Sequence, residues 1–106
     1  MKANEFIKKF GFDETKRVVR LTNGNSWADH YDIKNDAIGT AGTKFSKELC
    51  DKNDNFVFIS DLKRLIESHK LVNNLCGLEE AKSYLSLSNV RIDGLKQAIT
   101  DVESCL

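Results

Sequence analysis

Two segments of this chain follow one pattern, and this duplication constrains the fold more than any other feature. Residues 6–21 (FIKKFGFDETKRVVRL) and 72–87 (VNNLCGLEEAKSYLSL) each hold an apolar-periodic stretch, a Gly, an apolar residue, two acids and a Lys. Gly has no Cβ and accepts the positive φ that often follows a helix. Acids favour the first turn of the next helix. The pattern therefore predicts two helix–Gly–helix corners, at Gly11 and Gly77.

A second echo pairs residues 59–63 (ISDLK) with 92–96 (IDGLK), and each leads into a helical pattern. We expect Ser60 or Asp61 to cap the clearest helix of the chain. Its apolar positions recur with the spacing of one helix face and predict a buried stripe: Leu62, Leu65, Ile66, His69 and Val72. After a short extended segment at residues 90–92, Asp93 is expected to cap a last helix.

The middle third carries the sheet. Residues 22–26 and 51–55 are rich in turn formers, and residues 56–59 are β-branched and aromatic. We expect strands at 30–33, 37–38 and 56–59, with a short helix at 44–50. The sequence thus predicts a mainly helical α+β fold, with about five helices in two helix–Gly–helix/extended/helix units and a small antiparallel sheet. We interpret it as a single domain, 1–106, with units 3–70 and 71–106 and an insertion at about 22–55.

Composition narrows the function classes. The chain has 106 residues, and its sixteen basic and sixteen acidic residues cancel, so its overall field does not attract a polyanion. No apolar run reaches the roughly 20 residues of a membrane span, and no signal-type segment opens the chain. The three Cys are widely spaced without a C-x-x-C, which is typical of free thiols in a reducing compartment. We expect a cytoplasmic protein without a metal or cofactor.

The insertion holds the densest chemical cluster, because the only Trp lies within five residues of a His and a Tyr. Exposed aromatic residues with flanking acids favour a protein-binding anchor. The alternative is that Trp27 and Tyr31 fill the underside of the small sheet. The candidate partner-binding residues are Trp27, Asp29, His30, Tyr31, Asp32 and Asp36.

Two further interpretations remain open. The first 22 residues are locally basic, and a small nucleic-acid-binding regulator would use phosphate contacts that weaken with salt. The candidate residues for this alternative are Lys8, Lys9, Lys16, Arg17 and Arg20. A self-associating module is the third interpretation, with Cys76 and the two Gly corners packed across a two-fold axis to form a homodimer.

No catalytic set is predicted. His69 lies on an apolar stripe, where a histidine that donates to a backbone carbonyl is commoner than a general base. Asp51 follows Cys50, and its charge would raise the thiol pKa. Because a Ser or Cys nucleophile needs an activating base held by a third group, we predict a non-enzymatic protein.

The stretch at residues 59–72 (ISDLKRLIESHKLV), continued by 75–82 (LCGLEEAK), resembles small uncharacterised proteins encoded by bacteriophages and prophages. These proteins also place an Ala-x-His-Tyr element after an N-terminal helix–Gly–helix, which matches Ala28 to Tyr31 here. The similarity covers about two thirds of the chain and misses most of 34–54. It implies an accessory protein in the cytoplasm of an infected bacterium, binding and inhibiting a host or defence protein, of an anti-restriction or anti-CRISPR type. It brings no catalytic residues.

Overall fold

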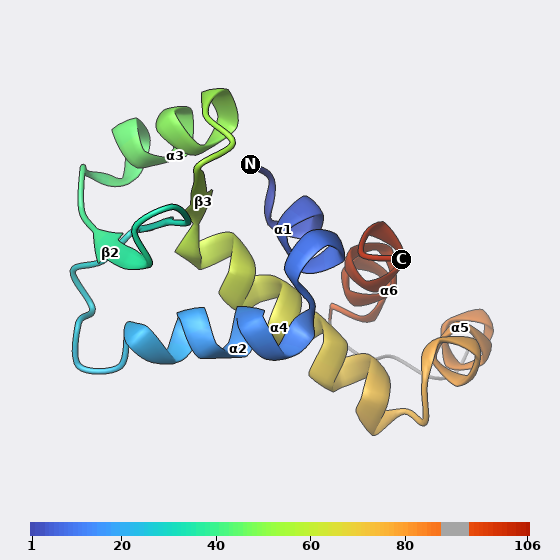
Figure 1. Cartoon of the computed structure of the whole chain (residues 1–106). Helices are drawn as coiled ribbons and strands as arrows, with labels where there is room; N and C mark the ends of the chain where they lie inside the picture. Colours follow the sequence, from blue (N-terminus) through green and yellow to red (C-terminus); the bar gives the residue numbers. More distant parts are fainter. Residues whose placement is uncertain (88–93) are drawn as a thin grey trace. The chain divides into compact units, whose positions relative to one another are not determined.

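The computed structural model describes residues 1–87 and 94–106, which form six helices and a three-stranded antiparallel sheet (Figure 1). The fold is α+β and mainly helical, as predicted. The structure has one helix more than the five main ones that we expected. This helix is α3 (Thr43–Lys52), which was expected as a short helix at 44–50 and has ten residues. The chain divides into two compact units, residues 1–63 and 64–106, and this division lies earlier than the expected boundary at 70/71.

The first unit contains two helices, a sheet with one helix inserted, and the start of a long helix. Its elements are α1 (Ala3–Phe10), α2 (Phe12–Leu21), β1 (His30–Asp32), β2 (Ala37–Gly39), α3 (Thr43–Lys52), β3 (Phe56–Phe58) and the beginning of α4 (Ile59–Asn74). The strand order is β2-β1-β3, so β1 is the central strand. The three strands match the expected strand positions within two residues.

Tyr31 occupies the centre of this sheet. It pairs with Ile38 on β2 and with Val57 on β3, and it is almost fully buried. The ring of Phe6 on α1 meets the Tyr31 ring edge-on, with centroids 6.1 Å apart. Helices α1 and α3 both contact β3. Burial of aromatic and aliphatic side chains on one face of a short sheet stabilises this unit.

The two helix–Gly–helix corners form with different geometry. Gly11 has φ 90° and its N–H donates to the Ile7 carbonyl at 2.9 Å, as predicted for the end of α1. At the second corner Gly77 also has a positive φ, 110°, as predicted, but the long helix ends before it. Cys76 takes the left-handed conformation (φ 69°), and the N–H groups of Cys76 and Gly77 donate to Asn73 and Val72. This Schellman pattern ends α4 at Asn74, so Gly77 instead precedes α5.

The long helix begins earlier than its expected caps. Helix α4 follows β3 directly at Ile59, whose N–H donates to the Asp29 carbonyl at 3.1 Å. Ser60 and Asp61 therefore lie inside the first turn, because the sheet supplies the acceptor that a side-chain cap would have supplied. The predicted apolar stripe is confirmed by burial of its four aliphatic residues. His69 donates from Nδ1 to the Leu65 carbonyl at 2.8 Å, as expected for a histidine at the edge of a core.

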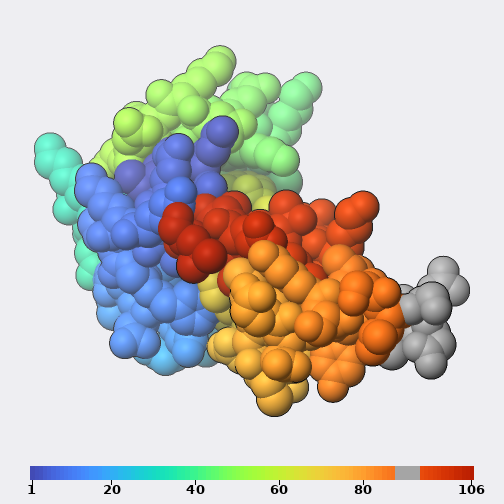
Figure 2. All heavy atoms as spheres, turned by 90° about the vertical axis from the view of Figure 1, so that its right-hand side faces the viewer, coloured from blue at the N-terminus to red at the C-terminus, as the bar shows by residue number. Residues whose placement is uncertain are grey.

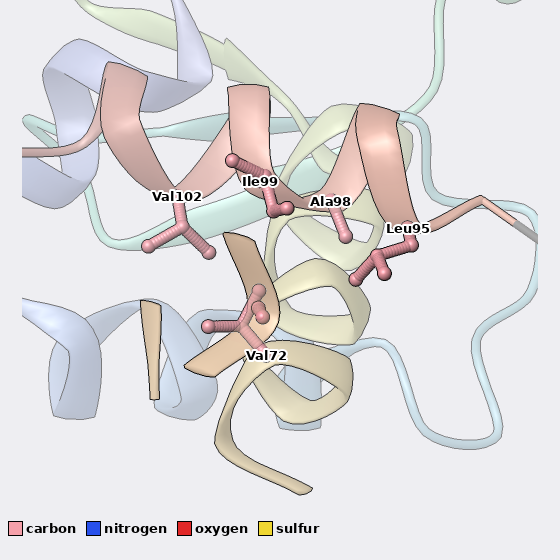
Figure 3. Packing of buried hydrophobic residues seen from close by; sticks show 6 residues of the cluster. Val72, Leu95, Ala98, Ile99 and Val102 are labelled. Atoms are coloured by element: carbon pink, nitrogen blue, oxygen red, sulfur yellow. The ribbon is translucent and has the colours of Figure 1, made fainter. Parts of the chain in front are cut away.

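The second unit packs the rest of α4 with α5 (Leu78–Ser86) and α6 (Leu95–Ser104). Helices α5 and α6 contact each other, and Figure 2 shows their residues, in orange and red, side by side. Four buried residues of α6 share one helix face and point toward Val72 of α4 (Figure 3): Leu95, Ala98, Ile99 and Val102. Ala81 of α5 completes this core.

A buried acid joins α4 to α6 in this unit. Asp101 is 4 % exposed and accepts hydrogen bonds from Ser68 Oγ at 2.6 Å and from Gln97 Nε2 at 2.9 Å. The Arg64 guanidinium lies 3.5 Å away. A buried carboxylate tolerates its loss of hydration only with such partners. The expected extended segment at 90–92 and the Asp93 cap lie outside the described residues. Among the residues that are described, no helix has the length and apolarity to cross a membrane.

Candidate functional site

A polar network ties α2 to the β1–β2 hairpin in the first unit. The Tyr31 hydroxyl donates to Asp36, whose Oδ1 also accepts from Arg17 Nη2 at 2.8 Å. Arg17 Nη2 lies 3.2 Å from the Tyr31 hydroxyl, and its guanidinium pairs with Glu14 within the same helix. Tyr31 and Asp36, both predicted to bind a partner, thus have partners within the fold.

The ionisation of this network follows its contacts. Burial, together with the hydrogen bond to Asp36, raises the pKa of Tyr31 to about 12. Hydrogen bonds from Arg17 and then Tyr31 hold the pKa of Asp36 below its ordinary value. The bonds to Glu14 and Asp36 raise the pKa of Arg17. The network is therefore an anion–cation contact with a neutral phenol, which stabilises the hairpin rather than offering charge to a ligand.

Asp29 and His30 lie at the start of the β1–β2 hairpin and hydrogen-bond to each other. Asp29 Oδ1 lies 2.8 Å from His30 Nδ1, and the Asp29 carboxylate also accepts from the Ala41 N–H at 3.2 Å and the Thr40 hydroxyl at 3.3 Å. Burial alone would raise the pKa of Asp29, but the hydrogen bonds from His30, from the Ser46 hydroxyl, and from Ala41 and Thr40 outweigh it and lower the pKa. The His30 ring covers Gly39 so closely that a Cβ there would lie 2.7 Å from Nε2. That nitrogen is therefore closed off by β2.

Asp32 supports the turn of the same hairpin. Its carboxylate accepts from the Asn35 backbone N–H at 3.2 Å, from the Asn35 side chain at 2.7 Å and from Asn55 Nδ2 at 2.6 Å. These bonds lower the pKa of Asp32, led by the one from the Asn35 side chain. Four of the side chains predicted to bind a partner protein are thus already bonded to other residues of this chain: Asp29, His30, Asp32 and Asp36.

Trp27 behaves differently from its neighbours. Its side chain is 54 % exposed, whereas Tyr31 is 3 % exposed, so the expectation that both residues fill the sheet is right for Tyr31 and wrong for Trp27. Trp27 lies at a cleft of about 420 Å³ formed by three segments of the first unit: residues 26–29, 40–43 and 58–63. Ala28, Phe58 and Ile59 supply apolar wall, and Asp29 and Lys63 supply charge.

Sequence reasoning missed Lys63, Ser60 and Thr43 as members of this cleft. Ser60 was expected only as a helix cap, Thr43 precedes the predicted helix at 44–50, and Lys63 was not singled out. No sequence pattern indicates that residues 26–29 fold against the start of α4. The bond from the Ile59 N–H to the Asp29 carbonyl places them together. Phe45, 72 % exposed and two residues beyond Thr43, was also missed.

The basic residues of the first two helices do not form one unoccupied surface. Arg17 is bound to Glu14 and Asp36. Lys9 stands 5.4 Å from the centroid of the Phe10 ring, and Lys16 stands 5.0 Å from that of Phe12. Cation–π contacts of this kind hold a lysine against its own helix. Lys8 and Arg20 are exposed.

The interior beneath α3 holds a thiol and a hydroxyl. Burial raises the pKa of Cys50 to about 11, and the charge of Asp51 adds to this, in the direction expected from the sequence. The Ser46 hydroxyl is fully buried and lies between the Asp29 carboxylate and the Cys50 thiol, and its hydrogen bonding acts to lower the pKa of both. A protonated, enclosed thiol is a poor nucleophile. In the part of the chain that the structure covers, no three His, Cys, Asp or Glu residues gather to hold a metal ion.

No family model, curated protein or solved structure matches this chain.

Proposed function

We propose that this chain is a non-enzymatic interaction protein whose partner docks at the Trp27 cleft. The observation that supports it is the only Trp of the chain, 54 % exposed beside a cleft of about 420 Å³. A large aromatic side chain left in water loses free energy that a partner can recover by covering it, and Trp is among the residues that dominate interface energetics.

The polar side chains around the cleft support binding over catalysis. Nucleophilic catalysis needs a nucleophile and a base within hydrogen-bond reach. The His30 ring has its Nδ1 on Asp29 and its Nε2 against Gly39, so neither nitrogen faces the cleft with room for a substrate. The Cys50 thiol is buried and held protonated.

The partner we propose is a bacterial host or defence protein, of the kind that anti-restriction and anti-CRISPR proteins inhibit. This choice depends on the resemblance of the segments around residues 59–82 to phage accessory proteins. The basic surface of the first helices favours a nucleic-acid regulator less, because Arg17 is already paired and the chain has no net charge.

The test is co-purification from bacterial lysate with a tag at the C-terminus, because the Met1 amino group contacts carbonyls near β3. We expect one stoichiometric protein that the Trp27→Ala variant loses. Tyr84→Ala is the matched control, since Tyr84 is an exposed aromatic residue of the other unit. Equal recovery by Trp27→Ala, or recovery of no protein in gentle salt, would count against the proposal, and concentration-dependent sedimentation without a partner would favour self-association.

A further inference from the structure

The polar groups that line the Trp27 cleft are mostly donors without acceptors. Within residues 1–87 and 94–106, the Lys63 ammonium makes no ion pair or hydrogen bond, and the Trp27 indole N–H has no acceptor. The hydroxyls of Ser26, Thr43 and Ser60 also line the cleft, and none of them has a partner in these same ranges. An ammonium and an indole N–H can only donate.

The one acid of the cleft does not neutralise Lys63. Both oxygens of Asp29 are taken, Oδ1 by His30 and Ala41 and Oδ2 by Thr40 and Ala41. Lys63 therefore has no ion-pair partner in the cleft, although the Asp29 carboxylate beside it remains ionised. Helices α3 and α4 also begin beside the cleft, and the N-terminal end of a helix dipole is positive, like the charge of Lys63.

We propose that the Trp27 cleft takes an acidic side chain of the partner protein, with the carboxylate at Lys63 and the adjoining apolar surface against the indole. This inference rests on the proposed function and specifies the chemistry of its partner. A carboxylate accepts several hydrogen bonds at once, and those to charged donors are the strongest. Nucleic acid is the weaker occupant, because binding to a phosphate backbone needs several cations and this cleft has one.

The probe is a capped hexaglutamate peptide, titrated while the emission of the single Trp is recorded. We expect a saturable change that added salt weakens, because an exposed charge pair is screened. Lys63→Gln should weaken binding roughly fivefold, the size of an exposed charge pair, and Lys63→Glu should abolish it. Lys47→Gln, an exposed lysine of α3 outside the cleft, should bind as the parent chain does.

A capped hexaglutamine peptide and a hexathymidylate serve as competitors of different chemistry. Absence of a response to hexaglutamate, equal binding by Lys63→Gln, or tighter binding of hexathymidylate would each overturn the inference. Failure of the wider proposal looks different. A protein partner that needs Trp27 but is retained by Lys63→Gln leaves the proposed function standing and removes only its acidic chemistry, whereas a partner retained by Trp27→Ala removes the function itself.

Discussion

Asp36 and Lys63 are both exposed charged side chains of the first unit, but of these two only Asp36 has an ion-pair partner among residues 1–87 and 94–106. Asp36 belongs to the hairpin network with Arg17 and Tyr31, in which each polar group has a partner. Lys63 belongs to the cleft beside Trp27, where neither its ammonium nor the Trp27 indole N–H has a partner among the described residues. Polar groups that are bonded within the chain stabilise the fold, whereas polar groups without a partner can bind a ligand. Changes in the hairpin should therefore act on stability, and changes in the cleft should act on binding.

The largest expected effect sharpens this contrast with two aromatic truncations. Tyr31→Ala removes a buried ring at the centre of the sheet and should cost about 3–5 kcal/mol in the free energy of unfolding. Trp27→Ala should change it by less than about 0.5 kcal/mol, because its ring is half exposed. Denaturant unfolding followed by circular dichroism measures both. Comparable losses in the two variants would break the comparison.

The hairpin network should also affect how the free energy of unfolding changes with pH in the alkaline range. The folded pKa of Tyr31 is about 12 against an ordinary 10.0, so the folded state keeps the phenol proton longer. Its contribution is present below pH 10 and is lost as the pH rises from 10 to 12, on the order of 2 kcal/mol. In Tyr31→Phe this part of the loss should be missing. Identical alkaline slopes for the two proteins would contradict the raised pKa.

The buried Ser46 hydroxyl offers a smaller test. Because the hydroxyl acts on the Asp29 carboxylate and the Cys50 thiol, its removal should lower the free energy of unfolding by about 1 kcal/mol. Ser46→Ala is the variant, measured by denaturant unfolding. Ser46→Val, which adds volume in place of the hydroxyl, is a control for packing. A clear gain of stability in Ser46→Ala would show that the hydroxyl has no partner in the interior.

The smallest effect compares the two exposed charges directly. Asp36→Asn should lower the unfolding midpoint slightly, because the Arg17 guanidinium loses its ionised partner. Lys63→Gln should leave the midpoint unchanged. Thermal unfolding at low and at high salt distinguishes them, since only the difference between the parent chain and Asp36→Asn should shrink when salt is added.

Most of the fold could be predicted from the periodicity of apolar residues and from turn-forming residues. The apolar stripe of α4, the Gly11 corner and the three strands follow from local sequence preferences. Two helix ends differed from the prediction: Ile59 starts α4 because its N–H donates to the Asp29 carbonyl, and α4 ends at Asn74 because Cys76, before Gly77, also takes a positive φ. Trp27 could be predicted as a candidate, but nothing in the sequence showed that it would be exposed while Asp29 to Asp36 would be bonded within the fold. That separation depends on partners such as Arg17 and Asn55, distant along the chain.

The most direct measurement is the accessibility of the Trp27 indole to acrylamide in the free chain and in its complex with the co-purified partner. Because the chain has one Trp, quenching of its emission reports on the cleft alone when the partner's Trp residues are replaced or spectrally separated. The account predicts strong quenching of the free chain and protection in the complex. A stoichiometric complex in which the indole stays as accessible as before would contradict it.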